Sequence, residues 1–276
     1  MKRLFTIATI ILMVLSASAQ DAKTAVCIGQ FKNNSNVSDV VAKTLRNEIV
    51  DGINKKNRLT LVDIATLGNL PSSKNEMLKT LSEKGIEYLI EGTLNAVNSK
   101  KVDDYYNAEV NYSLTIIETE TGITKATEAY KDTWSIGNNS DEAILKAMGN
   151  AKSRMAKFVD DNFKVEAVIK ALDQVDPKKG VKTCYISIGS AQGIIKGQIF
   201  EVFAKMEVAG EMIDKKIGEV KAKEVMSPTL TLCDVKNGGL DIQKNYENKV
   251  QLTVVSRAKN GGFLEKVSNG LDNALQ

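Results

Sequence analysis

The chain has 276 residues, 43% of them hydrophobic, and its 37 basic residues nearly balance its 34 acidic ones. This size and composition are typical of globular protein with room for two modest domains. The near balance of charge argues against nucleic acid as a partner, because phosphate binding depends on concentrated positive charge. The sequence has no histidine, which excludes Ser-His-Asp and Cys-His catalytic systems and histidine-ligated zinc. We therefore predict no catalytic residue, metal ion or cofactor.

The first 19 residues have the pattern of a secretory signal peptide. A basic pair precedes an apolar run from Leu4 to Leu15, and the small residues Ala17 and Ala19 define a cleavage point before Gln20. The apolar run is shorter than the ~20 residues that span a bilayer, and no cysteine follows the cleavage point to carry a lipid. The sequence thus predicts a periplasmic protein without an integral membrane span after cleavage, with peripheral association at the outer membrane as an open alternative.

Residues 20–163 are predicted to form one domain in which helices and strands alternate. The helices are indicated by apolar residues that recur every three to four positions, and the strands by short apolar runs or strict alternation, which is clearest from Tyr106 to Ile116. We expect an α/β (α+β), three-layer-like domain whose mixed sheet is flanked by helices. In chain order the elements are strand Thr24–Phe31, helix Val37–Ile53, strand Leu59–Val62, helix Asn75–Lys84, strands Tyr88–Val97, Tyr106–Ile116 and Ile123–Ile136, and a long helix from Asn139 to Asn162.

After Phe163 the pattern changes to short strands separated by glycine turns. Residues 164–258 are therefore predicted to form a small all-β barrel or sandwich domain. Residues 259–276 are predicted to be a weakly helical C-terminal tail. The strands are Val165–Leu172, Val181–Ile188, Gln198–Met206, Ile217–Val225, Thr229–Val235 and Val250–Val255.

Three residue patterns resemble catalytic or ligand-binding motifs. Gly189, Gly193 and Gly197 superficially resemble a phosphate-binding loop. Their order does not fit G-x-x-x-x-G-K-[ST], and a strand follows them where such a loop requires a helix, so we interpret them as turn glycines. The pairs Asp103–Asp104 and Asp160–Asp161 are adjacent in sequence, whereas catalytic carboxylates normally come from separate segments. Trp134 and the nearby tyrosines alternate along strands, and this spacing favours packing over a ligand platform.

The three cysteines, Cys27, Cys184 and Cys233, lie in apolar segments and form no C-x-x-C pair. Buried thiols are one interpretation. The alternative is a disulfide between Cys184 and Cys233, which belong to the same predicted domain and could pair in an oxidising compartment.

Two motifs in the first predicted domain carry a family resemblance. Gly85–Gly92 has the order G-x-x-Y-hydrophobic-hydrophobic-x-G, and Leu114–Gly122 is a hydrophobic strand that ends in Thr-Gly. With the opening segment Thr24–Asp63, they make residues 24–162 resemble the CsgG-like family, the curli-secretion-channel and penicillin-binding-protein-activator group, which has a TolB N-terminal-like fold. The second domain, with I-S-I-G-S-A-Q-G-I-I-K-G, is similar to the C-terminal domain of the flagellar ring-assembly protein. The resemblance implies binding to envelope proteins, with homo-oligomerisation an alternative, and no active-site residues.

Our hypothesis from the sequence is a non-enzymatic, exported cell-envelope protein that acts as a protein–protein interaction or assembly factor. Two alternatives are a subunit of an outer-membrane secretion channel of the curli type and a carboxylate-based glycan hydrolase. Against the channel stand the missing lipid-bearing cysteine and the connection from Asn98 to Asp104, which we interpret as too short and charged to form membrane-spanning hairpins.

Overall fold

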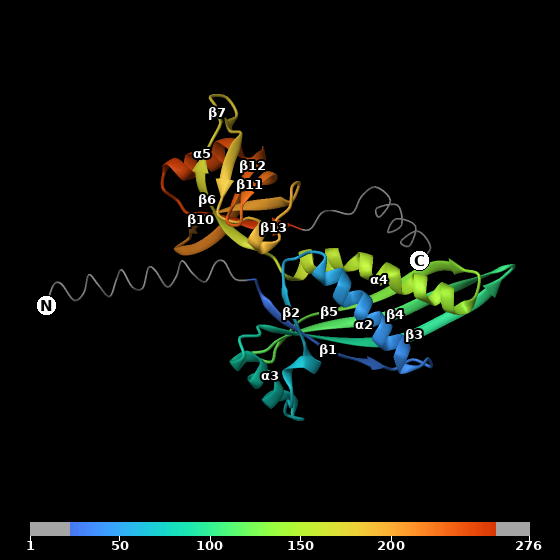
Figure 1. Ribbon diagram of the computed structural model, residues 1–276. Coiled ribbons are helices and arrows are strands. Elements are labelled where there is room, and N and C mark those ends of the chain that lie inside the picture. The colour runs from blue at the N-terminus through green and yellow to red at the C-terminus, as the bar shows by residue number, and fades with distance from the viewer. Residues whose placement is uncertain (1–22, 258–276) are drawn as a thin grey trace. The chain divides into compact units, whose positions relative to one another are not determined.

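A computed structural model describes residues 23–257, apart from the side chains of residues 132–134. The predicted signal peptide, with Ala17, Ala19 and Gln20, and the predicted tail lie outside the described residues. The chain forms two compact units, of which the first extends to Asn162 and includes Ala191–Gly193, and the second comprises Phe163–Ser190 and the residues from Ile194 onward (Figure 1). The predicted mixed α+β architecture is confirmed. Between residues 23 and 257, no helix combines the length and apolarity needed to cross a membrane.

The first unit is built on a five-stranded sheet with the order β2-β1-β3-β4-β5. Strand β1 runs parallel to β2 and to β3, whereas β3, β4 and β5 form an antiparallel meander. The parallel pairs are joined through helices and the antiparallel pairs through tight turns, as their geometry requires. Its elements are β1 (Ala25–Asn33), α2 (Asp39–Asn54), β2 (Thr60–Asp63), η1 (Ile64–Leu67), α3 (Lys74–Glu83), β3 (Tyr88–Val102), β4 (Tyr105–Glu118), β5 (Thr124–Gly137) and α4 (Ser140–Asn162).

Helices cover the two faces of this sheet unequally. The long helices α2 and α4 lie on one face and α3 lies on the other (Figure 1). Tyr112 and Leu114 of β4 are fully buried, whereas Ser113 between them points the other way and is partly exposed. The helices α2 and α4 approach each other closely at Gly52, where a Cβ atom would lie 2.4 Å from the carbonyl oxygen of Lys152. Only glycine fits there without a shift of the helices.

The hairpin of β3 and β4 is longer than the sequence analysis expected. The segment from Asn98 to Asp104, interpreted above as a short charged connection, contains the last strand residues of β3 and a two-residue turn at Asp103 and Asp104. The ladder continues without a break from Val97 opposite Val110 to Val102 opposite Tyr105. Cross-strand pairing therefore outweighs the weak strand propensity of the asparagine and lysine residues at this end of the hairpin.

A buried arginine joins α2 to the sheet where β1 is irregular. The pairing of β1 with β3 shifts register between Ile28 and Phe31. Arg46 donates hydrogen bonds from Nε to the carbonyl of Gly29 (2.8 Å) and from Nη2 to that of Ile28 (3.2 Å), and forms an ion pair with Asp63 (2.8 Å). Burial raises the pKa of Asp63, but hydrogen bonds from the Ala65 N–H and from Arg46 more than offset this and hold it below its usual value.

The second unit is a closed six-stranded barrel with the order β10-β11-β12-β9-β6-β13. Closure occurs because β13 pairs with both β10 and β6. Inward-facing residues such as Phe200, Val202 and Val254 fill its core. Its elements are β6 (Glu166–Leu172), β7 (Val175–Asp176), β8 (Gly180–Val181), β9 (Thr183–Ile186), β10 (Ile199–Val208), β11 (Glu211–Ser227), β12 (Leu230–Asn237), α5 (Gly239–Glu247) and β13 (Leu252–Arg257). The short helix η2 (Ser190–Gln192) is divided between the two units, since Ala191–Gly193 belong to the first.

Three details of the second unit differ from the sequence analysis. The expected strand Val181–Ile188 is split into β8 and β9. The short helix α5 was not expected, and its N-cap is Gly238 in a left-handed conformation. Strand β11 begins at Glu211, six positions before the expected start at Ile217. The structure thus has a longer β10–β11 hairpin than the sequence suggested.

Replacing Arg46 with methionine keeps an apolar stem but removes the donors for the Ile28 and Gly29 carbonyls. We expect the free energy of unfolding of the first unit to fall by about 3 kcal/mol, since buried carbonyls lose their partners. Chemical denaturation measures the change. The matched control is Lys43→Met on the exposed side of the same helix, for which we expect a change within about 0.5 kcal/mol. Equal effects for both variants would show that Arg46 does not hold the irregular strand.

Candidate functional site

The adjacent acids that a glycan hydrolase could use serve structural roles. Asp103 and Asp104 form the exposed turn between β3 and β4. Asp160 lies at 2.8 Å from both Lys56 and Arg58, and the side chain of Arg58 is 1% exposed. Burial lowers the pKa of Arg58, while the charge and hydrogen bond of Asp160 oppose this shift. The structure therefore makes Asp160 a counter-ion for a buried cation.

The electrostatics of the carboxyl groups do not single out a general acid. A general acid that works near neutral pH needs a raised carboxyl pKa. In the described part of the chain, each shifted carboxyl pKa moves downward, as at Asp176, where hydrogen bonds from Lys182 and from the N–H groups of Lys178 and Lys179 lower it to about 2. Residues 23–257 also contain no cluster of three or more metal-binding side chains.

Two other sequence features are explained by folding. Tyr112 and Tyr130 stack with their ring centroids 4.9 Å apart, and Tyr112 is fully buried, so this pair belongs to the packing of the sheet. The side chain of Trp134 lies outside the described residues. Gly193 and Gly197 have φ values of 69° and 89°, and strand β10 follows them, which confirms them as turn glycines.

The barrel brings two of the three cysteines together. Cys184 of β9 and Cys233 of β12 lie directly opposite each other in the antiparallel ladder, and both are fully buried. Cys27 lies in the core of the other unit, with residues of α3. The three thiols are free in the structure.

The most distinctive surface feature is a hairpin that continues past the barrel. We call residues Lys205–Asp214, the distal part of β10, the turn and the start of β11, the arm. Strand β13 pairs with β10 only as far as Ala204, opposite Leu252, so the arm is a ribbon of two strands. Ala209 and Gly210, with φ values of 55° and 86°, form the tight turn at its tip. Positive φ at both turn positions gives the twist that favours such hairpins.

One side of the arm is mostly apolar, apart from Glu211 opposite Val208. Met206 pairs with Ile213, and both lie on the side of Ala204, which points into the barrel core. The inward-facing pattern of the barrel therefore continues beyond its end, where nothing in the described chain covers it. Met206, Val208 and Ile213 are 36%, 51% and 42% exposed, and Met212 on the other side is 65% exposed. Clustered exposed apolar side chains of this kind mark interaction surfaces.

A groove of about 310 Å³ lies at the base of the arm on the outer side of the barrel wall. Its lining combines Phe203, Lys205 and Asp214 with side chains of β13 and its neighbours. The remaining lining residues are Glu166, Gln251, Thr253 and Val255. The groove therefore lies beside the point at which β13 stops pairing with β10.

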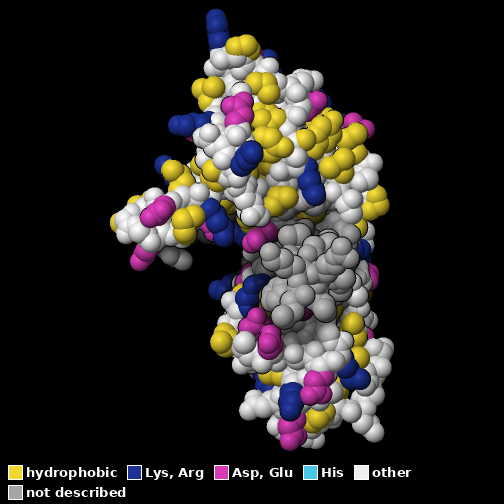
Figure 2. Space-filling view, turned by 90° about the vertical axis from the view of Figure 1, so that its left-hand side faces the viewer, with side chains coloured by type: hydrophobic (Ala, Val, Ile, Leu, Met, Phe, Trp, Pro, Cys, Tyr) yellow, Lys and Arg dark blue, Asp and Glu magenta, His cyan; other side chains and the backbone are white. Residues whose placement is uncertain are grey.

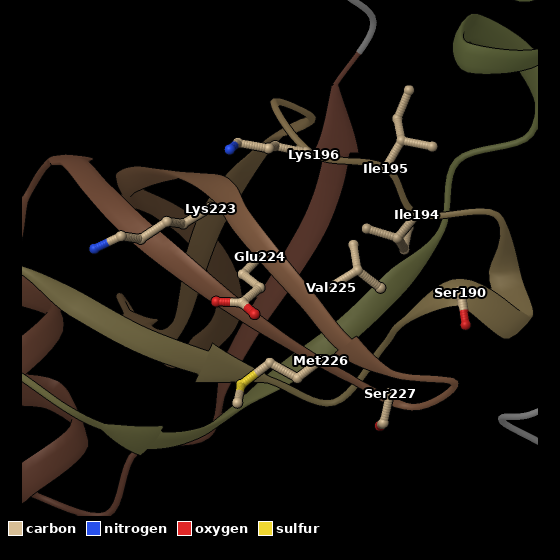
Figure 3. Close-up of a pocket in the computed structure, with 9 residues that line it drawn as sticks. All are labelled: Ser190, Ile194, Ile195, Lys196, Lys223, Glu224, Val225, Met226 and Ser227. Atoms are coloured by element: carbon tan, nitrogen blue, oxygen red, sulfur yellow. The ribbon is translucent and has the colours of Figure 1, made fainter.

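A second, larger groove of about 780 Å³ lies at the opposite end of the β10–β11 pair. In Figure 3, the side chains of Lys196 and Lys223 extend to the same side of this groove, whereas Ile194 and Val225 lie close to each other. Met226 is half exposed at its rim. On the face shown in Figure 2, hydrophobic side chains likewise lie at the surface of the barrel unit among charged ones. The groove thus combines charged and apolar side chains.

The arm was not predicted from the sequence, although residues 205–214 carry a signal for it. Residues 205–208 alternate between charged and apolar side chains, and after Ala209-Gly210 the apolar pair Met212 and Ile213 lies between two acids. A two-residue turn that contains glycine and follows such alternation is typical of a hairpin. The expected strand boundaries at Met206 and Ile217 left this segment out.

Comparisons with known proteins give distant structural similarities. No family model matches the chain, and no curated protein matches it. Among solved structures, the PelC dodecamer from Paraburkholderia phytofirmans has 12% identity and a TM-score of 0.34, and the match covers 48% of this chain and 87% of that one. Lipoprotein GNA1162 from Neisseria meningitidis has 10% identity and a TM-score of 0.36, over 46% of this chain and 94% of that one. The LpoB C-terminal domain from Salmonella enterica has 14% identity and a TM-score of 0.28, over 40% and 82%. These values assign neither family nor function, and the CsgG-like resemblance stays a prediction.

The adjacent acids Asp160 and Asp161 provide a matched test of the structural assignment. Asp160→Asn leaves the buried Arg58 without its carboxylate, so we expect the free energy of unfolding to fall by about 3–5 kcal/mol. Asp161→Asn removes only an exposed ion pair with Lys157, and we expect a loss below about 1 kcal/mol. Thermal and chemical unfolding give both numbers. Equal losses would contradict the assignment of Asp160 as the counter-ion of Arg58.

Proposed function

We propose that this chain is a non-enzymatic, exported cell-envelope protein that binds another protein through the arm and acts as an interaction or assembly factor. The observation that carries the proposal is the apolar side of the arm, formed by Met206, Val208 and Ile213. Water contacts these side chains in the isolated chain, and burying them against a partner provides the free energy of binding.

The backbone of the arm supports binding of an extended segment. Beyond Ala204, strand β10 has β11 on one side and no neighbour on the side that β13 occupies within the barrel, as far as the described residues extend. An unpaired strand edge offers N–H and C=O groups in the spacing that another strand requires. A partner strand that follows the line of β13 would pair with Lys205–Val208. Its apolar side chains would meet Met206 and Val208.

The side chains of the arm favour a protein over other ligands. Its charges are of both signs, as in the facing pair Lys205 and Asp214, and this pattern does not suit a polyanion. The arm contains no aromatic side chain to stack on a sugar or a base. Methionines such as Met206 and Met212 adapt their shape to apolar partner surfaces.

Matched serine variants test the arm. We expect Met206→Ser/Val208→Ser/Ile213→Ser to reduce partner capture at least tenfold, because each buried apolar anchor contributes on the order of 1 kcal/mol or more to binding. The control, Lys205→Ser/Glu207→Ser/Asp214→Ser, changes the opposite side of the same ribbon and should retain most of the capture. The measurement is crosslinking in intact cells from a photoreactive residue at position 211, which pairs with Val208 on the apolar side and is changed in neither variant, with mass spectrometry of the trapped species. Equal capture by both triple variants would reject the apolar side as the binding surface.

Export is tested at the N-terminus. Sequencing of the protein recovered from an osmotic-shock fraction should start at Gln20, and Ala19→Arg should leave the precursor uncleaved, because signal peptidase accepts only small residues next to the cut. The matched control is Gln20→Ser, just past the cut, which should be processed normally. Recovery of wild-type protein that still begins at Met1 would contradict the predicted signal peptide.

A further inference from the structure

The two barrel cysteines occupy positions that a disulfide can bridge. Cys184 and Cys233 are paired residues of the neighbouring antiparallel strands β9 and β12. Val235 donates its N–H to the carbonyl of Lys182 at 2.8 Å, which marks that pair as a hydrogen-bonded position of the ladder. Hydrogen-bonded positions recur at every second pair, so Cys184 and Cys233 also occupy one. Their Cα atoms are therefore about 5.5 Å apart, a separation common among disulfides.

The side chains of Cys184 and Cys233 both point into the barrel core. Both cysteines belong to the buried core of the barrel and have no exposed surface. Paired residues of a ladder lie on the same side of the sheet, so the two cysteine side chains are neighbours on the inner face of the barrel. The third cysteine, Cys27, is packed against Leu81 and Leu89 in the core of the first unit. The fold thus favours one pairing among the three that are combinatorially open.

We propose that Cys184 and Cys233 form a cross-strand disulfide when the chain folds in the presence of a disulfide oxidant. The thiolate of one cysteine attacks the oxidant disulfide and forms a mixed disulfide, which releases one oxidant thiolate. The thiolate of the second cysteine then attacks the protein sulfur of that mixed disulfide and releases the other oxidant thiolate. Two protein thiols lose two protons and two electrons, and one oxidant disulfide is reduced to two thiols.

The bond must form before the barrel closes. In the folded barrel, burial raises the pKa of the Cys184 thiol to about 12, and burial and the neighbouring Cys184 raise that of Cys233 further. Thiol–disulfide exchange proceeds through the thiolate, so buried thiols with raised pKa values react very slowly. Once formed, the bond is shielded from reductants because the same burial keeps them out.

Refolding of the full chain tests the pair independently of export. The reduced chain is unfolded in urea, diluted into buffer with excess oxidised glutathione, quenched with acid, unfolded again and labelled with N-ethylmaleimide. Of the three cysteines, we expect one to be labelled, at Cys27, and peptide mapping should recover the peptides of Cys184 and Cys233 linked to each other. Three labelled cysteines, a link that includes Cys27, or glutathione adducts at positions 184 and 233 would each overturn the proposal.

Cysteine variants distinguish a disulfide between Cys184 and Cys233 from two free thiols that only fill the core. Cys27→Ser should refold with no labelled cysteine, and Cys184→Ala should leave Cys27 and Cys233 both labelled. The link closes a loop of about 50 residues. Wild-type chain that is reduced while unfolded in urea, where the bond is accessible, and is then refolded with reductant should therefore melt roughly 5 °C or more below the oxidised chain. Cys184→Ala/Cys233→Ala should melt at the same temperature with and without reductant. An unchanged wild-type melting temperature on reduction would count against a formed bond.

Discussion

Strand β13 determines the form of the second unit, because it is the strand that closes the barrel. It pairs with β6 on one side and with β10 on the other, and its pairing with β10 ends at Leu252 opposite Ala204. Up to that pair, inward-facing side chains are enclosed in a core. Beyond it, the same alternation on β10 and β11 faces water. One hydrogen-bonded boundary thus separates residues that are buried in the core from apolar residues that are exposed to solvent.

In the first unit, buried arginine side chains hold the helices and the sheet together. Arg46 fastens α2 to the irregular part of β1 and to Asp63, and Arg58 pairs with Asp160 of α4. Each guanidinium joins elements that are distant in sequence and satisfies oxygen atoms that would otherwise be desolvated without a partner. Asp63 and Asp160 are therefore accounted for by the assembly of sheet and helices.

The sequence predicted the regular parts of the fold well, because apolar periodicity reports directly on burial. The helix Val37–Ile53 and the alternating strand Tyr106–Ile116 appear as α2 and β4. Features that depend on distant pairing were missed. The polar residues after Val97 extend β3 only because β4 lies beside them, and barrel closure follows from the pairing of β13 with two strands. The same limit applies to the candidate site, since exposure of the arm becomes apparent only once the end of β13 is known.

The way the arm is attached to the barrel determines which substitutions it can accept. The chain enters and leaves it at Ala204 and Lys215, which face each other across the ladder, so the two attachment points stay about 5 Å apart whatever sequence lies between them. Mutations in the arm leave the enclosed core untouched and are free of the packing constraints that govern Phe200 or Val202. The sequence of the arm can therefore change without disturbing the side chains that fill the barrel.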